Sequence, residues 1–413
     1  MLIKSIASQA KKASIITAAL DSDIKNQALA AIADALQHHA ADIIQANEQD
    51  IAQAKKDNVS TVLIKRLKFD QAKLTDSIAG IHSLIELPDP VSQTLCCTEL
   101  DKNLELYKIS CPIGVLGIVF ESRPDALVQI SSLALKSGNV VLLKGGTEAA
   151  RTNRILAQII STAGILAGLP QGWLALLETR EDVKAMLALD DDINLIIPRG
   201  SNPFVKFIMD NTRIPVLGHA DGICHVFVDR DADLDMAVSV VINAKLRRPG
   251  ICGATETLLV DGAAPSGFLP ALTKALLDAG CEVRGDAGAQ NVDARVKLAT
   301  EADWGTEYLD AIIAVKTVDG VDAAIAHINR YGTQHTDAII TGNAKTAEHF
   351  LRSIDSAIVL HNASTQFADG GEFGFGAEIG IATGKLHARG PVGVEQLTTF
   401  KYLVRGTGQV RPK

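Results

Sequence analysis

The chain has 413 residues, with 48 acidic and 40 basic side chains and a formal charge of -8. Hydrophobic residues make up 47% of it, which is ordinary for a folded protein with a sizeable core and excludes wholesale disorder. The acidic balance, with a pI near 5.7, argues against a nucleic-acid-binding protein, which would usually present a basic surface. The length suits two to three domain-sized units or one large α/β subunit.

The cysteines and the N-terminus indicate a reducing environment. The six cysteines are too sparse for a disulfide scaffold, and none of them has the spacing of a zinc site. The first residues contain no apolar signal core, and no apolar run approaches the roughly 18 residues that cross a bilayer. We therefore expect a soluble cytoplasmic protein with reduced thiols and no metal.

The pattern of apolar residues predicts helices first and then two α/β units. The first ninety or so residues show helical spacing of apolar positions, and an exposed strand is expected over 104–109. Buried strands are expected over 113–120, 140–143, 174–177, 193–197, 257–260, 311–315, 338–341 and 357–360. Helices are expected over 126–136, 148–163, 182–189, 233–247, 321–329 and 344–354. This alternation predicts parallel sheets covered on both faces, with ligands at the carboxyl ends of the strands.

The common nucleotide-binding signatures are missing from the chain. No GxGxxG follows an expected strand, and there is no GxxxxGK[ST] motif. The glycine-rich stretch 370–384 comes closest, but it lacks the third glycine at the right spacing. A dinucleotide would therefore have to bind without the usual fingerprint.

Cys252 is the strongest candidate for a nucleophile. An expected helix ends near three basic residues, Lys245, Arg247 and Arg248, and a Pro-Gly turn then leads to Cys252. Adjacent cations favour a thiolate, and flanking glycines leave it open to a substrate. The alternative is a small apolar residue that fills a turn.

Three further segments place basic residues where a phosphate can be held. They are Arg199, Gly200 and Ser201 after an expected strand, Lys144, Gly145 and Gly146 after another, and Lys385, His387 and Arg389 beyond the glycine-rich stretch. Strand ends that lead into helix starts are natural anion sites. An ordinary helix cap and a solvated surface loop are the alternatives.

Together these segments resemble the gamma-glutamyl phosphate reductases of the aldehyde dehydrogenase superfamily. The resemblance runs from about residue 104 to the C-terminus, and its pieces occur in the order 112–124 (PIGVLGIVFESRP), 144–146 (KGG), 198–201 (PRGS), 219–225 (HADGICH), 248–252 (RPGIC), 305–310 (GTEYLD), 331–337 (YGTQHTD) and 370–380 (GGEFGFGAEIG). It implies an aldehyde-dehydrogenase-like α/β fold, with two parallel-sheet domains and a small oligomerisation flap.

The resemblance also implies roles for individual residues. Cys252 takes the nucleophile position, Glu307 holds the nicotinamide ribose, and Lys144 contacts the adenine-side ribose. The full implied cofactor set is Lys144, Gly145, Gly146, Arg199, Gly200, Ser201 and Glu307. Many relatives that use NAD carry an acid where this chain has Thr147, and an acid would repel a 2'-phosphate, so NADP(H) is the expected cofactor.

Two departures from the wider superfamily favour reduction over hydrolysis. The oxyanion-hole asparagine of hydrolytic relatives falls near Ser122, so the backbone N–H of Cys252 is expected to carry more of the oxyanion stabilisation. The stretch 218–222 has no counterpart of the glutamate that activates water against the thioester. An enzyme whose thioester accepts hydride does not need that base.

The implied reaction is the NADPH-dependent reduction of L-glutamyl 5-phosphate to L-glutamate 5-semialdehyde and phosphate, the second step of proline biosynthesis from glutamate. The expected substrate contacts are Arg123, Lys245, Arg248, His387 and Arg389. The alternatives are an enzyme for another acyl phosphate or a free aldehyde, a catalytically silent scaffold, and one half of a bifunctional kinase–reductase. The Met1 start and the lack of a kinase segment favour a free-standing reductase, with functional coupling to glutamate 5-kinase.

The expected domains follow from the same resemblance. Residues 1–229 and 361–396 are expected to form the NADP-binding domain, with flap strands at about 94–110, and residues 230–360 the catalytic cysteine domain. Residues 397–413 are the expected oligomerisation tail, in which 401–405 alternate and extend a partner's sheet. A homodimer or homotetramer is therefore expected.

Overall fold

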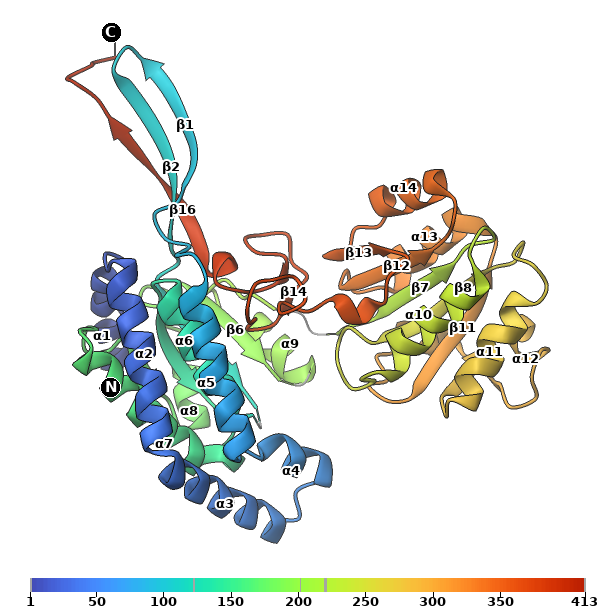
Figure 1. Ribbon diagram of the computed structural model, residues 1–413, viewed down its shortest axis with the longest axis horizontal. Coiled ribbons are helices and arrows are strands. Elements are labelled where there is room, and N and C mark those ends of the chain that lie inside the picture. The colour runs from blue at the N-terminus through green and yellow to red at the C-terminus, as the bar shows by residue number, and fades with distance from the viewer. Residues whose placement is uncertain (1, 122, 201, 219–220, 412–413) are drawn as a thin grey trace. The chain divides into compact units, whose positions relative to one another are not determined.

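The computed structural model describes residues 2–121, 123–200, 202–218 and 221–411. The chain forms two compact units, which are described separately (Figure 1). The first contains Met1–Gly218, Gly374–Gly380 and Val392–Lys413, and the second contains His219–Phe373 and Ile381–Pro391. No helix in the described part of the chain is long and apolar enough to span a bilayer.

The first unit begins with a layer of helices, as the sequence predicts. They are α1 (Leu2–Thr17), α2 (Ser22–His38), α3 (Ala40–Lys56), α4 (Thr61–Leu67) and α5 (Gln71–Glu86). Leu29, Ile32 and Leu36 form a fully buried stripe on α2, because residues at these spacings share one helix face. Helix α2 packs beside α5, and both appear side by side in Figure 1.

A four-stranded parallel sheet forms the core of the first unit. Its strand order is β5 (Leu174–Leu176), β4 (Val140–Lys144), β3 (Val115–Phe120) and β6 (Leu195–Arg199). Its helices are α6 (Pro124–Lys136), α7 (Ala150–Leu166) after a short 3-10 turn (Thr147–Ala149), α8 (Arg180–Met186) and α9 (Asn202–Asp210). Every residue of β3 and β4 is buried, which confirms the prediction of a doubly covered sheet from continuous apolar runs.

A separate antiparallel sheet extends from the first unit. It consists of β1 (Thr94–Asp101), β2 (Leu104–Pro112) and β16 (Thr398–Arg405), in that order, and it projects away from the helices in Figure 1. The tail strand, which the sequence predicted to extend a partner's sheet, pairs with β2 of its own chain, with Lys401 opposite Ile109. Strand β16 is still an edge strand, so its other edge has no neighbouring strand in the described sheet.

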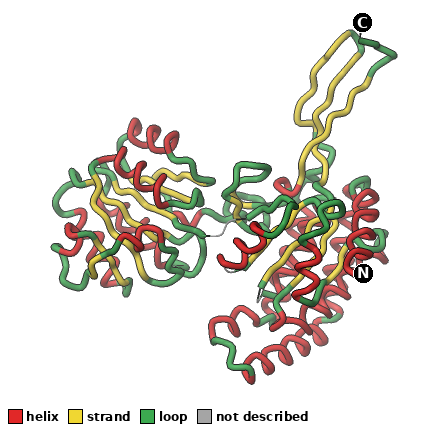
Figure 2. The backbone as a smooth tube through the Cα atoms, turned by 180° about the vertical axis from the view of Figure 1, so that it is seen from behind, coloured by secondary structure: helices red, strands yellow, loops and turns green. Residues whose placement is uncertain are grey.

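The second unit is built on a seven-stranded parallel sheet. The order is β10 (Lys297–Leu298), β9 (Glu282–Gly285), β11 (Ile312–Val318), β8 (Thr255–Asp261), β7 (Cys224–Val228), β12 (Thr336–Ile340) and β13 (Ile358–His361). The helices are α10 (Leu234–Leu246), α11 (Phe268–Asp278), α12 (Ala287–Gln290), α13 (Gly320–Tyr331) and α14 (Ala344–Ser353). Figure 2 shows these helices on both sides of the strands.

Alternation along the strands explains this double cover. Val226 and Leu258 face one layer, where they pack with residues of α10 and α11. Phe227 and Leu259 face the opposite layer, where they pack with residues of α13 and α14. The glycine-rich stretch 370–384 contains the short strand β14 (Ile381–Ala382), which pairs with β15 (Gly390–Pro391) just beyond it. The remaining short helices are Glu301–Gly305, Thr365–Phe367 and Glu395–Leu397.

The boundaries of the units differ from the expected domains. Strand β7 belongs to the second unit, because it pairs with β8 and β12 in the middle of the large sheet. Residues 361–373 and 381–391 also belong there, whereas the sequence placed all of 361–396 with the cofactor domain. The sequence did not predict β9, which carries Glu282 and Arg284 in four residues, or α11, which has a proline in its first turn.

Candidate functional site

Cys252 lies in the turn between α10 and β8. Its side chain is half-buried, and its carbonyl oxygen accepts a hydrogen bond from the thiol of Cys224 at 3.1 Å. A Cβ added to Gly222 would lie 2.4 Å from that oxygen and 2.8 Å from the Cα of Cys252. The close approach therefore requires glycine at position 222.

Glu307 reaches the same point from the segment before β11. Its Oε1 accepts a hydrogen bond from the backbone N–H of Gly222 at 3.0 Å. Gly222 thus connects the residue predicted to be the nucleophile with the residue predicted to hold the nicotinamide ribose. Nothing in the sequence spacing places these three residues together.

Cys224, the first residue of β7, supports the Cys252 turn through the hydrogen bond from its thiol. It is fully buried, and burial raises the pKa of its thiol well above the usual range. Its sulfur lies 3.5 Å from Nδ1 of His335. A thiol that stays protonated here remains a donor to the Cys252 carbonyl.

A buried ion pair joins α10 to β8, the two elements on either side of this turn. Nζ of Lys245 is 2.5 Å from Oε2 of Glu256, and both side chains are fully buried. Burial raises the pKa of Glu256 to about 7, and the nearby Lys245 opposes that rise. Oε1 of Glu256 accepts the N–H of Leu309, a residue with a left-handed φ of 53°.

Lys245 was expected to contact the substrate, and the structure places it in the interior instead. Its ammonium is held by Glu256 and lies 5.8 Å from the centre of the Tyr308 ring. An ammonium without a buried counter-charge would be costly, which is the physical reason for the pairing. Its basic neighbour Arg248 is exposed.

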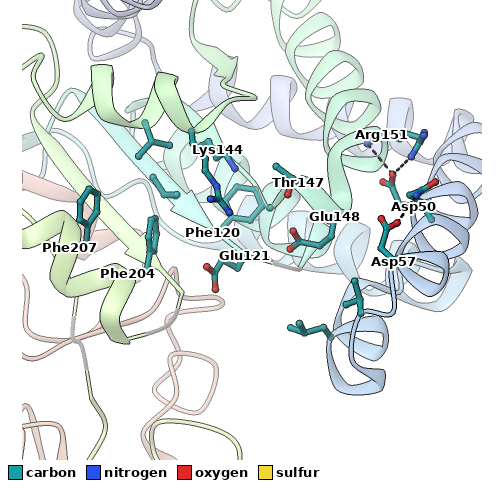
Figure 3. Close-up of a pocket in the computed structure, with 18 of the residues that line it drawn as sticks. Asp50, Asp57, Phe120, Glu121, Lys144, Thr147, Glu148, Arg151, Phe204 and Phe207 are labelled. Atoms are coloured by element: carbon teal, nitrogen blue, oxygen red, sulfur yellow. Dashed lines mark hydrogen bonds and ion pairs between the residues drawn. The ribbon is translucent and has the colours of Figure 1, made fainter.

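A cavity with a volume of about 820 Å³ lies at the carboxyl ends of β3 and β4. Figure 3 shows Lys144 within it, with Phe204 and Phe207 of α9 toward one end and Asp50 with Arg151 toward the other. Lys144 is only 7% exposed, and its Nζ donates to the carbonyl of Gly145 at 2.7 Å. Burial lowers the pKa of Lys144.

Gly145 is required by its surroundings, whereas the neighbour of Gly146 is the flexible carboxylate end of Glu148, which can move. A Cβ on Gly145 would lie 2.2 Å from Nδ2 of Asn153, and one on Gly146 would lie 2.0 Å from Oε1 of Glu148. Backbone in this turn can therefore approach a ligand closely, as a phosphate or ribose site needs. Glu148, next to Thr147, also lines the cavity.

The segment after β6 lies next to this cavity. Arg199 is paired in register with Phe120, which lines it. A Cβ on Gly200 would approach the carboxyl carbon of Glu121, another lining residue, to 3.0 Å. Ser201, and Ser122 of the expected oxyanion site, lie outside the described residues.

The other expected substrate contacts have different surroundings. The guanidinium of Arg389 donates to Oδ1 and the carbonyl of Asp355 at 2.9 and 2.7 Å, so a substrate anion would compete with Asp355. His387 is exposed on the same loop and has a left-handed φ of 66°. Arg123 is half exposed, with its Nη2 at 3.3 Å from Oδ2 of Asp125.

Comparison with known proteins gives a consistent result over the chain. The model of the family described as "Aldehyde dehydrogenase family" matches residues 3–290. The chain is 53% identical to the gamma-glutamyl phosphate reductase of Ruminiclostridium cellulolyticum over 410 residues, covering 99% of this chain and 95% of that protein. It is 55% identical to the enzyme of the same name from Pelotomaculum thermopropionicum, with 99% and 94% covered.

Solved structures are similar over the same length. The crystal structure of gamma-glutamyl phosphate reductase from Thermotoga maritima matches with a TM-score of 0.97 and 40% identity, covering 99% of this chain and all of that one. An acetylating aldehyde dehydrogenase from Geobacillus thermoglucosidasius matches with a TM-score of 0.69 at 17% identity, covering 100% and 98%, which shows a shared fold.

Proposed function

Because the chain belongs to the aldehyde dehydrogenase family, and its relatives over the full length include gamma-glutamyl phosphate reductases, we propose that it reduces L-glutamyl 5-phosphate to L-glutamate 5-semialdehyde and phosphate with NADPH. Family membership makes the protein an oxidoreductase that acts on an aldehyde group with a nicotinamide cofactor. The observation that carries the finer proposal is that Gly222 contacts both the Cys252 turn and Glu307, which come from three separate segments of the chain. We also propose that this reaction is the second step of proline biosynthesis from glutamate.

Cys252 would act as the nucleophile on the acyl phosphate. Its thiolate attacks the acyl carbon, a C–S bond forms, and the C–O bond to phosphate breaks, so that phosphate leaves and a thioester remains. The hydrogen bond from Cys224 holds the Cys252 carbonyl, and the Gly222 backbone limits how far the turn can move. The segment 218–222 contains no glutamate to activate water, so hydrolysis of the thioester is not assisted there.

The residues that line the 820 Å³ cavity fit the adenine side of a dinucleotide. The glycine turn 145–146, in which a side chain at position 145 would clash with Asn153, and the buried ammonium of Lys144 would hold its adenine-side ribose and phosphates. Glu307 would hold the nicotinamide ribose. When bound, NADPH supplies the hydride that converts the thioester to the aldehyde. Thr147 supports NADPH over NADH, because it adds no negative charge beside a 2'-phosphate.

The test is the reverse reaction, the reduction of NADP by glutamate semialdehyde, measured with and without phosphate. The proposal requires dependence on phosphate, because phosphate must release the acyl group from Cys252. Parallel assays with NAD measure the cofactor preference. Reduction of NADP that is independent of phosphate would instead identify a dehydrogenase of free aldehydes.

A Cys252→Ala variant tests the nucleophile. Turnover should fall by at least about 10⁴-fold, because no thioester can form, while binding of NADPH measured by fluorescence titration stays within twofold. Cys96→Ala is the matched control, because Cys96 is exposed on β1. This variant should keep full activity. Sustained turnover by the Cys252→Ala protein would remove Cys252 from the mechanism.

We further propose that the chain assembles through its antiparallel sheet. Phe400, Tyr402 and Val404 share one face of β16 by alternation, and each remains about half exposed in the single chain. Large apolar side chains grouped in this way are typical of an interface. A homodimer or homotetramer would cover them.

A further inference from the structure

A second, smaller cavity lies at the connection between β3 and α6. The 820 Å³ cavity that contains Lys144, called the cofactor cavity below, lies at the same connection. The smaller cavity has a volume of about 240 Å³, and its wall includes Arg123 and Asp125, which follow β3. The cofactor cavity is lined by Val119, Phe120 and Glu121, the residues just before them. Both cavities therefore lie at the carboxyl end of β3, where ligands of parallel sheets bind.

Four charged side chains line this smaller cavity and balance one another. Lys73 and Asp76 come from α5, and Arg123 and Asp125 come from the start of α6. Oδ2 of Asp125 lies 3.6 Å from Nζ of Lys73 and 3.3 Å from Nη2 of Arg123. These distances exceed the 2.7–2.9 Å or so of a strong charge-assisted bond, so both cations can accept a further anion.

The rest of the wall is polar or small. Gln129 and Ser77 add amide and hydroxyl groups, and Ile81 and Leu84 add buried apolar surface. Gly80 leaves open space, because a Cβ added there meets nothing within 4 Å. The cavity is smaller than the roughly 300–1,000 Å³ of drug-sized sites, and so it suits a small metabolite.

We propose that this cavity binds the α-ammonium and α-carboxylate groups of an amino acid. Lys73 and Arg123 would pair with the carboxylate, and Asp76 and Asp125 with the ammonium. A simple anion such as phosphate fits less well, because the two aspartates repel it. The proposal rests on the proposed function, whose substrate carries this zwitterionic group; a free amino acid carries it as well, and the experiment separates the two sources.

Gly80→Met fills the cavity at small cost to the fold. Gly80 lies inside α5, where methionine has the higher helix propensity. Ala79→Met is the matched control, because Ala79 is exposed on the same helix and does not line the cavity. Lys73→Met removes a charge without filling the space, and it provides a second, independent variant.

Steady-state assays test the substrate as the source. In the reverse reaction, Gly80→Met and Lys73→Met should each raise KM for glutamate semialdehyde about tenfold or more, with KM for NADP within twofold of wild type. Their kcat/KM for pentanal, which lacks both head groups, should not change. Ala79→Met should match wild type throughout.

Calorimetric titration with L-glutamate tests a free amino acid as the source. Binding to wild type that is lost in both variants, with an unchanged KM for semialdehyde, would assign the cavity to a free amino acid. No change in any of these measurements overturns the proposal. If wild type lacks phosphate-dependent turnover, the proposed function fails, and the titration alone then decides for or against the cavity.

Discussion

The backbone of Gly222 is in van der Waals contact with Cys252, and its N–H is held by Glu307. A methyl group at position 222 would lie 2.4 Å from the Cys252 carbonyl oxygen, so the turn must move to admit it. The same shift would pull the 222 N–H away from Glu307. The positions of Cys252 and Glu307 therefore both depend on residue 222 having no side chain.

We expect Gly222→Ala to reduce kcat about 100-fold, because a displacement of about 1 Å at a reacting group has an effect of this size. The free energy of unfolding should fall by only about 1–3 kcal/mol. The measurements are the phosphate-dependent assay and urea unfolding. Gly305→Ala is the control, because a Cβ there meets nothing within 4 Å; equal activity of the two variants would contradict the role of Gly222.

The raised pKa of Glu256 predicts how stability depends on pH. Its folded-state pKa of about 7 lies above the ordinary 4.5, so the folded protein binds more protons between these values. The contribution of Glu256 to stability is therefore present below about pH 4.5 and is lost as the pH rises to about 7.

Glu256→Gln removes this titration and leaves the shape of the side chain. The stability of wild type relative to this variant should fall between pH 5 and pH 8, measured by urea unfolding at both values. The comparison cancels the contributions of the other carboxylates to the pH dependence of stability, because both proteins contain them. Many of these carboxylates have lowered pKa values, so their contributions to stability increase with pH. A difference that stays constant or grows with pH would show that Glu256 is ionised throughout.

At the scale of elements, Asp50 joins α3 to the start of α7 beside the cavity that contains Lys144. This carboxylate is 2% exposed, and its Oδ2 accepts both the N–H and the hydroxyl of Thr152 at 2.8 Å. Its Oδ1 accepts the guanidinium of Arg151 at 3.2 Å. An acid from one helix thus satisfies the free N–H groups at the N-terminus of another.

Asp50→Asn should lower the free energy of unfolding by about 2 kcal/mol, because the amide turns two donor hydrogens toward donors. Urea unfolding measures the change. Glu48→Gln, on an exposed position of the same helix, should shift the free energy by less than about 0.5 kcal/mol. Equal effects of the two substitutions would mean that Asp50 does not hold the helices together.

The elements with continuous apolar runs could be predicted from the sequence. Residues 140–143 were expected as a strand, and β4 spans Val140–Lys144, because burial on both faces leaves an unbroken apolar signal. Strand β10 has only two residues, Lys297 and Leu298, both exposed, and no such signal can mark it. Pairing with β9 alone makes it a strand.

At the scale of the whole molecule, the proposed assembly depends on the antiparallel sheet. The rings of Phe400 and Tyr402 lie 5.7 Å apart in an edge-to-face arrangement, and the ammonium of Lys108 lies 3.8 Å from the centre of the Phe400 ring. This face is preorganised for contact, because its aromatic side chains already hold one another.

Phe400→Glu combined with Tyr402→Glu should convert the assembly to monomers, because charges would be buried without partners. Light scattering coupled to size-exclusion chromatography at micromolar concentration measures the mass. Thr399→Glu lies on the other face of β16 by alternation and should keep the wild-type mass. A monomeric wild-type protein would refute assembly through this sheet.

The sequence by itself determined the parallel α/β class, the order of the main elements, the family, and the candidates Cys252 and Lys144. These depend on local periodicity and on short motifs, which a chain displays before it folds. Only the tertiary structure decided that Gly222 and Glu307 meet at Cys252, that Glu256 draws Lys245 into the interior, and that β16 pairs with β2. The first and third of these contacts join segments far apart in the chain, and the second joins the end of α10 to β8 across a turn, so each depends on the packing of whole elements.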